Sequence, residues 1–342
     1  MPEEIVPGLF RVSIPLPSDA LGSVNMYAVV SADGLRLIDT GWNAPEAYTA
    51  LADGLHELGV EVSDIKEVLL THNHPDHIGL AARLAQETGA RLLLHRLDAA
   101  SGAAYEEDRR GLLTEMLTWL QTNGMPPEER EMLLGGMRRM AYHMPTYRPD
   151  TLLEGGETLA WHPFRFEVIW TPGHAAGLVC LYEPQAHILI SSDHVLQHIS
   201  PNIGLYARQS GDPLGDYLRS LQLVRSLPVT MVLPGHGGPF PNLIDRVDTL
   251  LAHHEQRLQE MVDVLADGKD GGQTAYHIAS RLSWRGSATG WSQLQPFNHL
   301  AALSETLAHL EYLVIQGRAL KHFLGEETVC RLVGQHAGRN PT

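Results

Sequence analysis

The segment 71–77 reads Thr-His-Asn-His-Pro-Asp-His and directly follows the apolar run 68–70. Four of its side chains can bind a metal ion, namely His72, His74, Asp76 and His77. Residues 67–70 have the composition of a buried strand, and residues 78–87 that of a helix with Pro75 near its first turn. Neutral imidazoles and carboxylates suit zinc and similar divalent ions. The alternative is a polar helix start with solvated histidines, but four such side chains in one loop favour a metal-binding loop.

The chain around this loop alternates between strand and helix patterns, as expected for an α/β fold. Short apolar stretches bounded by turn residues predict strands at 8–15, 24–30, 35–39, 67–70, 90–95, 166–170, 178–182, 187–191 and 230–233. Helical patterns occupy 44–58, 77–88 and 213–227. The alternation stops at residue 241, which predicts a first domain spanning 1–240.

Polar residues recur where these strands end. Asp39 ends one strand, and His174 follows Thr-Pro-Gly after another. Asp193 follows Ser-Ser, and His236 lies within Pro-Gly-His-Gly. Taken singly, Asp39 could be a turn residue and the two histidines could be structural. Because α/β folds gather their chemistry at the carboxyl ends of strands, we expect these side chains to meet the loop 71–77.

The seven candidate ligands divide into two sets that share one carboxylate. The first set consists of His72, His74 and His174. The second set consists of Asp76, His77 and His236, and Asp193 would bridge the two. Two ions about 3.5–4 Å apart can share a nucleophilic hydroxide and polarise a carbonyl or phosphoryl oxygen. Asp39 is expected to hold the outer nitrogen of a ligating histidine, and His194 to face away from the ions.

Composition excludes several classes of protein. The 342 residues are 44% hydrophobic and 19% charged, which is typical of a globular protein with one or two domains. A formal charge of −15 disfavours nucleic acids and anionic membranes as partners. The two cysteines, Cys180 and Cys330, suggest no disulfide framework. Because neither a signal peptide nor an apolar run of ~20 residues is visible, we expect a cytoplasmic protein.

Residues 99–144 interrupt the α/β pattern with two predicted helices. One apolar face carries Leu113, Met116, Leu117 and Leu120, and the other carries Leu133, Met137, Met140 and Met144. A break is expected at 123–127, which contains Gly and two Pro residues. This insertion is either a helical hairpin that fills its own small core or an adaptable apolar cover over the site.

Residues 241–342 have a different character from the first 240. Helices are predicted at 242–265, 274–282 and 299–316, followed by two short β segments at 319–323 and 328–333. This is the order of a winged-helix unit. Residues 245–342 nevertheless contain nine basic and eleven acidic residues, and the third helix has no Lys or Arg. We therefore expect no nucleic-acid binding, and prefer packing, dimerisation as a homodimer, or lining of the site.

Five motifs in order resemble those of the metallo-β-lactamase superfamily over roughly residues 5–240. They are Leu-Ile-Asp39-Thr-Gly, Thr-His72-Asn-His74-Pro-Asp76-His77, Thr-Pro-Gly-His174, Ser-Ser-Asp193-His194 and Pro-Gly-His236-Gly. The resemblance implies an αββα sandwich with a dinuclear metal site on one edge, holding two divalent ions. Zinc is expected first, and iron or manganese would also suit the ligands. The helical tail resembles the winged-helix tail of the β-lactamase-like endoribonucleases.

Asp193 stands where antibiotic-degrading subclasses often carry cysteine. An aspartate at this bridging position resembles the glyoxalase II and lactonase members of the superfamily. Leu196 stands where acyl-homoserine-lactone lactonases carry a tyrosine. The resemblance implies a small-molecule substrate: a carboxylic ester, thioester or lactone with an apolar part. Phosphodiester or phosphotriester hydrolysis, endoribonuclease-like cleavage and a non-catalytic metal-binding sensor are the alternatives. The carboxylates expected to take part in catalysis are Asp76, Asp193 and Asp39.

Overall fold

The computed structural model describes residues 1–17, 22–143, 146–268, 271–284 and 291–334. Contacts divide the chain into two compact units. The sandwich unit comprises Met1–Glu107, Ala141–Pro201 and Ser220–Val247, and the helical unit comprises Asp108–Met140, Asn202–Arg219 and Asp248–Thr342. This grouping places most of the 99–144 insertion with the C-terminal segment. The domain division at residue 240 therefore stays a prediction.

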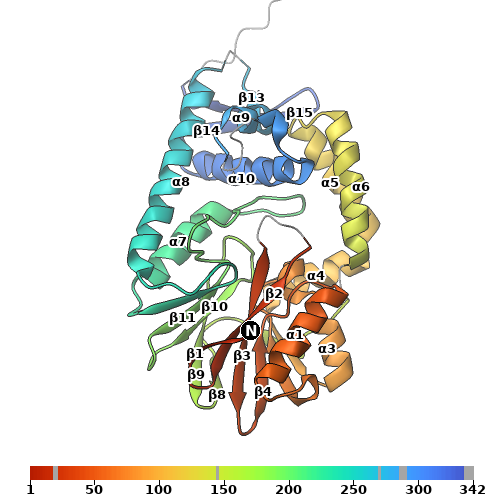
Figure 1. The fold of residues 1–342 in the computed structure, drawn as a ribbon. Helices are drawn as coiled ribbons and strands as arrows, with labels where there is room; N and C mark the ends of the chain where they lie inside the picture. The colour runs from red at the N-terminus through yellow and green to blue at the C-terminus, as the bar shows by residue number, and fades with distance from the viewer. Residues whose placement is uncertain (18–21, 144–145, 269–270, 285–290, 335–342) are drawn as a thin grey trace, which may run out of the picture. The chain divides into compact units, whose positions relative to one another are not determined.

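The sandwich unit contains two sheets (Figure 1). The seven-stranded sheet has the order β1(Glu3–Val6), β2(Leu9–Pro15), β3(Ser23–Ser31), β4(Gly34–Ile38), β5(Ile65–Leu69), β6(Arg91–His95) and β7(Thr151–Leu153). Strands β1 to β4 pair antiparallel, and β4 to β7 pair parallel. The five-stranded sheet has the order β12(Met231–Pro234), β11(Ile188–Ser192), β10(Val179–Glu183), β9(Phe164–Trp170) and β8(Thr158–Trp161). In it, only β11 and β12 pair parallel.

Apolar side chains of the two sheets pack face to face in one core. Ile38 and Leu69 come from the first sheet, and Phe166, Val168 and Ile190 come from the second. In β9, buried and exposed side chains alternate, as they must in a strand with one face against a core. On the opposite face of the second sheet, Cys180, Leu189 and Val232 are also buried. Both faces of that sheet are therefore covered.

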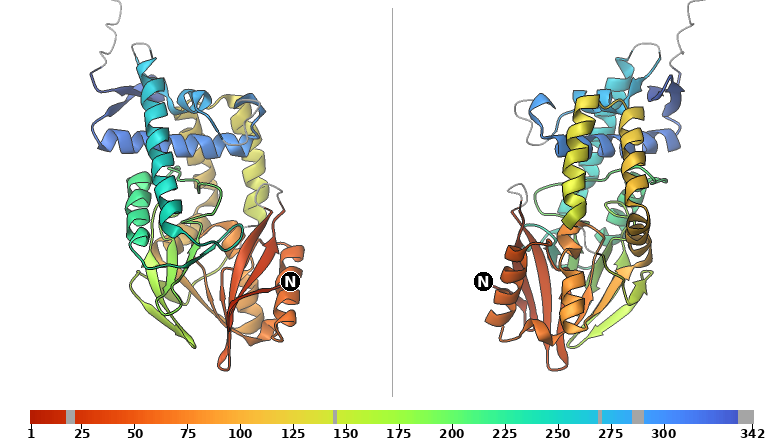
Figure 2. Two further views of the ribbon diagram at one scale, coloured as in Figure 1. Left: turned by 60° about the vertical axis from the view of Figure 1, so that its left-hand side comes forward. Right: turned by 90° about the vertical axis from the view of Figure 1, so that its right-hand side faces the viewer.

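Helices α1(Pro45–Glu57) and α3(Ala81–Thr88) cover the outer face of the seven-stranded sheet, as Figure 2 shows. The single helix predicted at 77–88 is wrong, because α2(Pro75–Ile78) ends before α3 begins. The N–H of Leu80 donates to the Thr40 hydroxyl, 3.2 Å away, and so leaves the helical hydrogen-bond ladder. A Cβ at Gly79 would lie 2.3 Å from the backbone nitrogen of Asn43, so only glycine fits at this junction.

Three helices, rather than the predicted two, occupy the insertion. They are α4(Arg96–Glu107), α5(Arg109–Thr122) and α6(Pro127–His143). Asp108 separates the first two, because its side chain accepts a hydrogen bond from the N–H of Gly111 (2.9 Å) and caps α5. The predicted break near Gly124 is confirmed, and this glycine has a φ of 88°. Met144 and the side chain of Met140 lie outside the described part of the chain.

In its described residues, the C-terminal segment contains three helices in the predicted order and a small sheet, whose strand β13(Gln273–Thr274) was not predicted. The helices are α8(Leu243–Ala266), α9(Ala275–Arg281) and α10(Pro296–Ile315), with a 3-10 turn at Trp291–Gln293. Strands β13, β15(Glu327–Leu332) and β14(Ala319–Leu324) form the sheet, with β15 in the middle. Helix α10 runs across α8 in both views of Figure 2. Helix α7(Pro213–Arg225) and the 3-10 turn Val62–Asp64 complete the fold. No described helix is long and apolar enough to span a membrane.

Candidate metal centre

The candidate site residues follow the carboxyl ends of strands from both sheets of the sandwich unit. Asp39 follows β4, and the loop 70–74 follows the neighbouring parallel strand β5. In the second sheet, Asp193 follows β11 and His236 follows the parallel strand β12. His174 lies in the connection from β9 to β10. Because parallel neighbours end at the same edge of a sheet, this topology brings distant parts of the chain together.

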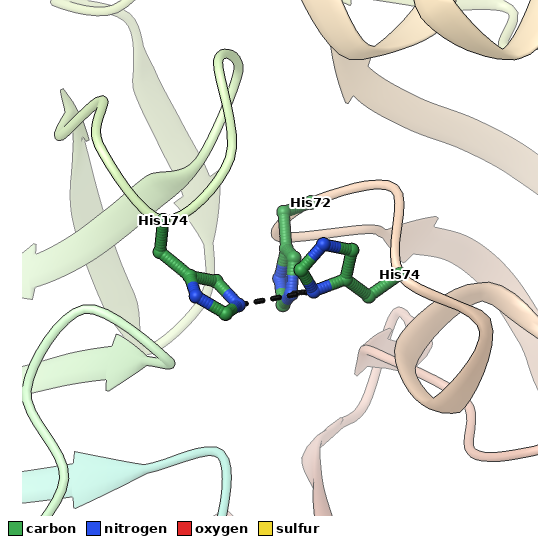
Figure 3. Close-up of side chains that lie close together, drawn as sticks. All are labelled: His72, His74 and His174. Carbon is green, nitrogen blue, oxygen red and sulfur yellow. Dashed lines mark hydrogen bonds between the residues drawn. The ribbon is translucent and has the colours of Figure 1, made fainter. Parts of the chain in front are cut away.

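Three imidazoles form the first group of ligands (Figure 3). His72 Nε2 lies 2.9 Å from His74 Nδ1, and His174 Nε2 lies 3.0 Å from the same atom. The three rings come from two loops and point toward one another. These three histidines are the ones predicted from the sequence as the first ligand set.

The second group contains Asp76, His77 and His236. His236 Nε2 lies 3.3 Å from Asp76 Oδ2. Asp193 Oδ2 lies 3.4 Å from His236 Nε2, 3.6 Å from His77 Nε2 and 3.7 Å from His174 Nε2. One oxygen of Asp193 is therefore close to imidazoles of both groups. The structure brings all seven predicted ligands together, whereas His194 belongs to none of the described groups.

Unpaired buried atoms show whether these residues fit a metal ion. Among the described residues, His77 Nε2, His236 Nε2 and Asp193 Oδ1 are buried without a hydrogen-bond partner. Each such atom costs about 1–3 kcal/mol unless something satisfies it. A divalent cation would do so, and imidazole nitrogens with carboxylate oxygens are ligands that zinc accepts. The donor set therefore fits a metal ion.

Two histidines of the second group are held in the tautomer that a ligand needs. His77 Nδ1 donates to Asp39 Oδ2 (2.7 Å), and His236 Nδ1 donates to the carbonyl of Ser23 (2.8 Å). In both rings, Nε2 is left to face the site. Asp39 also accepts from the N–H and the hydroxyl of Thr71, each at 2.8 Å. Asp39 itself belongs to neither ligand group, so its geometry is that of an outer partner.

The pKa shifts divide the site into neutral imidazoles and a group of oppositely charged side chains. Burial, reinforced by the neighbouring imidazoles, lowers the pKa of His72 well below its usual value and that of His74 to about 3. Burial also acts to lower the pKa of His236, but Asp193 and Asp76 outweigh it and raise that pKa to about 10. Against burial, nearby histidines hold the pKa of Asp193 well below its usual value and that of Asp76 at about 2.

His236 and His77 supply the positive charge beside Asp76 and Asp193, because against burial the carboxylates also raise the pKa of His77 well above its usual value. A divalent cation would supply that charge in their place once both rings lose the proton on Nε2.

Strand β3 holds the loop that carries His236. Tyr27 Oη and Asn25 Nδ2 both donate to the carbonyl of Pro234 at 2.8 Å, and Asn25 Nδ2 also donates to the carbonyl of Gly237 at 2.8 Å. Asn25 is only 2% exposed. Sequence reasoning missed Asn25 and Tyr27, although an asparagine inside an apolar strand was a signal that its amide has a structural partner.

The fold and the donor set together define a mixed α/β protein with a histidine- and carboxylate-rich metal centre. The family model of the metallo-beta-lactamase superfamily matches residues 19–236. This match covers more than half of the chain, so the chain belongs to the metallo-β-lactamase superfamily. The predicted family and the predicted fold class are confirmed. As a member of this superfamily, the chain is classed with metal-dependent hydrolases, as the sequence predicted.

Three relatives show how far the similarity extends. The probable metallo-hydrolase YqjP of Bacillus subtilis is 29% identical over 321 residues, covering 89% of this chain and 92% of the relative. The crystal structure of a metallo-beta-lactamase family protein from Thermus thermophilus is 31% identical, with a TM-score of 0.82, covering 96% of this chain and 100% of the other. The acyl-coenzyme A thioesterase MBLAC2 of Gallus gallus is 29% identical over 170 residues, covering 50% of this chain and 56% of the relative. The first two similarities include the C-terminal part of the chain.

Proposed function

We propose that the chain is a hydrolase with two metal ions that cleaves a thioester or related carboxylic ester with an apolar acyl part. The observation that carries this proposal is the position of Asp193 Oδ2, within 3.4 to 3.7 Å of imidazole nitrogens from both ligand groups. One ion could not use seven ligands, because zinc in proteins is usually four-coordinate. A carboxylate between two sets of imidazoles supports a bridging role.

When bound, two such ions supply a water that is nucleophilic at neutral pH and a Lewis acid for a carbonyl oxygen. The residues of the chain would divide the remaining tasks. His72 and His74 offer uncharged nitrogens, and His174 adds a third imidazole to this group. Asp76 and Asp193 offer the negative charge that balances the cations. Asp39 keeps the proton on Nδ1 of His77, so that Nε2 of this ring faces the site.

The thioester class is supported by the relative named as an acyl-coenzyme A thioesterase, which matches half of this chain. An apolar acyl part is the expectation from the methionine-rich insertion, whose role as a cover over the site stays a proposal. No specific observation favours phosphodiester or RNA substrates. Helix α10 contains no Lys or Arg that could contact a phosphate backbone.

Two measurements test this function. Protein purified without chelator should contain close to two ions per chain by elemental analysis, with zinc, iron and manganese measured separately. The same protein should then be assayed on acyl-coenzyme A thioesters of increasing chain length, a lactone, an aryl ester and an aryl phosphodiester. We expect thioester or ester turnover that chelator abolishes and metal restores. Because each buried methylene contributes about 0.8 kcal/mol, kcat/KM should rise with acyl length before levelling off.

A stoichiometry that stays at one ion under metal-replete conditions would contradict the dinuclear site. Turnover of the phosphodiester alone would contradict the proposed substrate class, but it would not contradict the proposal of two metal ions.

A further inference from the structure

Asp98 is a buried carboxylate that belongs to neither ligand group. It lies in the first turn of α4, and only 3% of its surface is exposed. Its Oδ2 accepts a hydrogen bond from the N–H of Asn73 at 2.8 Å, and its Oδ1 accepts one from the N–H of Gly177 at 2.6 Å. A carboxylate is rarely buried unless hydrogen bonds compensate for the lost hydration. These two hydrogen bonds therefore stabilise Asp98 in its buried position.

The two donors belong to the two loops that carry the first ligand group. Asn73 lies between His72 and His74, and Gly177 lies three residues after His174. One side chain therefore holds the backbone of both loops, one through each oxygen. The three imidazoles of this group come from these loops alone (Figure 3). Their spacing depends on how the loops are placed relative to each other.

The residues around Asp98 leave little free space beside its two hydrogen bonds. A Cβ at Gly177 would lie 2.7 Å from Cγ of Asp98, so the second loop can approach only with glycine at this position. The side chain of Asn73 is also held, because its Oδ1 accepts a hydrogen bond from Tyr147 Oη at 2.7 Å. A Cβ at Gly102 of α4 would lie 3.5 Å from Nδ2 of Asn73. Helix α4 thus approaches the first loop closely at Asn73.

We propose that Asp98 is a positioning residue of the metal centre, which fixes the loop of His72 and His74 against the loop of His174 so that their nitrogens converge. This role rests on the metal-binding part of the proposed function. Outer partners commonly contact a ligand side chain. Asp98 acts instead through the backbone beside the ligands, and it couples two loops that are about one hundred residues apart in the chain.

The test is a zinc titration of the full chain in competition with a chelator, without substrate. Asp98→Asn keeps the shape of the side chain but offers one carbonyl oxygen to two N–H donors, so one donor loses its partner. We expect the affinity for the zinc held by His72, His74 and His174 to fall by about 10–100-fold, the range typical of outer-partner changes. Gly177→Ala should act in the same direction, because the added methyl displaces the Asp98 carboxylate.

Glu183→Gln is the matched control. Glu183 is also a buried carboxylate of the sandwich unit that accepts a backbone hydrogen bond, from the N–H of Ala186 at 2.6 Å. It lies at the end of β10 remote from the His174 loop. Both variants should lower the unfolding temperature of the metal-free protein, but Glu183→Gln should keep the zinc affinity of the parent. Zinc affinity that falls equally in both variants, or in neither, would overturn the proposal.

A double variant separates positioning from general stability. In a His174→Ala background, the first group has lost the ligand that Asp98 aligns. Adding Asp98→Asn should then reduce zinc affinity less than it does in the parent. An undiminished effect would contradict the coupling of the two loops. Since no substrate is used, a parent that binds zinc but hydrolyses no thioester would refute the proposed substrate and leave the role of Asp98 intact.

Discussion

The Oδ2 atom of Asp193 lies within 3.7 Å of imidazoles from both ligand groups. If Asp193 bridges two ions, Asp193→Ala should remove at least one ion and nearly all hydrolysis. The fold should survive, because the change removes a buried negative charge and adds no atoms. Metal content, turnover and far-ultraviolet circular dichroism measure the three effects.

Asp150→Ala is the control for the Asp193 prediction. It removes a carboxylate of the same unit that accepts from the N–H of Leu92 (2.9 Å), at the start of β6. This variant should keep both ions. Retention of two metals and full turnover by Asp193→Ala would show that the bridging assignment is wrong.

Asp39 should matter less than Asp193, because it acts through His77. Asparagine tolerates the positive φ of 62° at this position, so Asp39→Asn should keep the backbone. An amide gives weaker support to the Nδ1 proton of His77, and we expect activity or metal affinity to fall by about 10–100-fold. Metal titration and turnover provide the measurement. A loss as severe as that of Asp193→Ala would mean that Asp39 itself contacts a metal or the substrate.

The seven residues that converge at the candidate metal centre could be found in the sequence, because metal binding restricts residue type and because most of them lie just after apolar strands. Asn25 and Asp98 could not be assigned their roles in the same way. Each acts on backbone groups of a remote segment, Asn25 on Pro234 and Asp98 on Gly177. Any residue type can supply a backbone N–H or carbonyl, so the sequence contains no sign of the partner.

At the scale of secondary structure, the long and strongly patterned elements were predicted well. The strands β1, β7, β8 and β13 were missed, since they have only two to four residues and depend on pairing with a neighbour. Helix α4 was not predicted as a separate element, since it follows β6 without an intervening loop. Such boundaries are set by tertiary contacts that local patterns do not contain.

Helix α10 is buried over much of its length, and this includes the carboxyl group of Glu305. Burial raises the pKa of Glu305 to about 7, although Arg257 acts to lower it. An acid whose folded pKa is above its unfolded value of about 4.3 stabilises the fold at low pH. This contribution is lost as the pH rises from about 4.3 through 7. Glu305→Gln should therefore gain stability relative to the parent between pH 5 and pH 8.

Urea unfolding at several pH values measures this gain. Glu311→Gln on the same helix is the control, because its carboxylate is more exposed and pairs with Lys321. The stability difference between this control and the parent should stay nearly constant over the same pH range. A constant difference between Glu305→Gln and the parent would show that Glu305 does not titrate there.

For the molecule as a whole, the charge of −15 bears on its partners. We expect no useful binding of nucleic acid, because α10 carries no Lys or Arg to displace condensed counterions. A fluorescence anisotropy titration with RNA and with duplex DNA at physiological salt tests this expectation. Micromolar binding that weakens steeply with added salt would refute it and favour a nuclease.

The helical unit is assembled from three stretches of chain, Asp108–Met140, Asn202–Arg219 and Asp248–Thr342. During translation, the first stretch leaves the ribosome long before the last. Its contacts Glu129–Tyr276 and Gln121–Glu326 can form only after residues more than one hundred positions later have been synthesised. Closing such large loops is slow, which exposes these helices to chaperones in the meantime. For the same reason, we expect that a protein truncated after residue 240 would not fold independently. It would contain residues 108–140 and 202–219 of the helical unit without the rest of that unit.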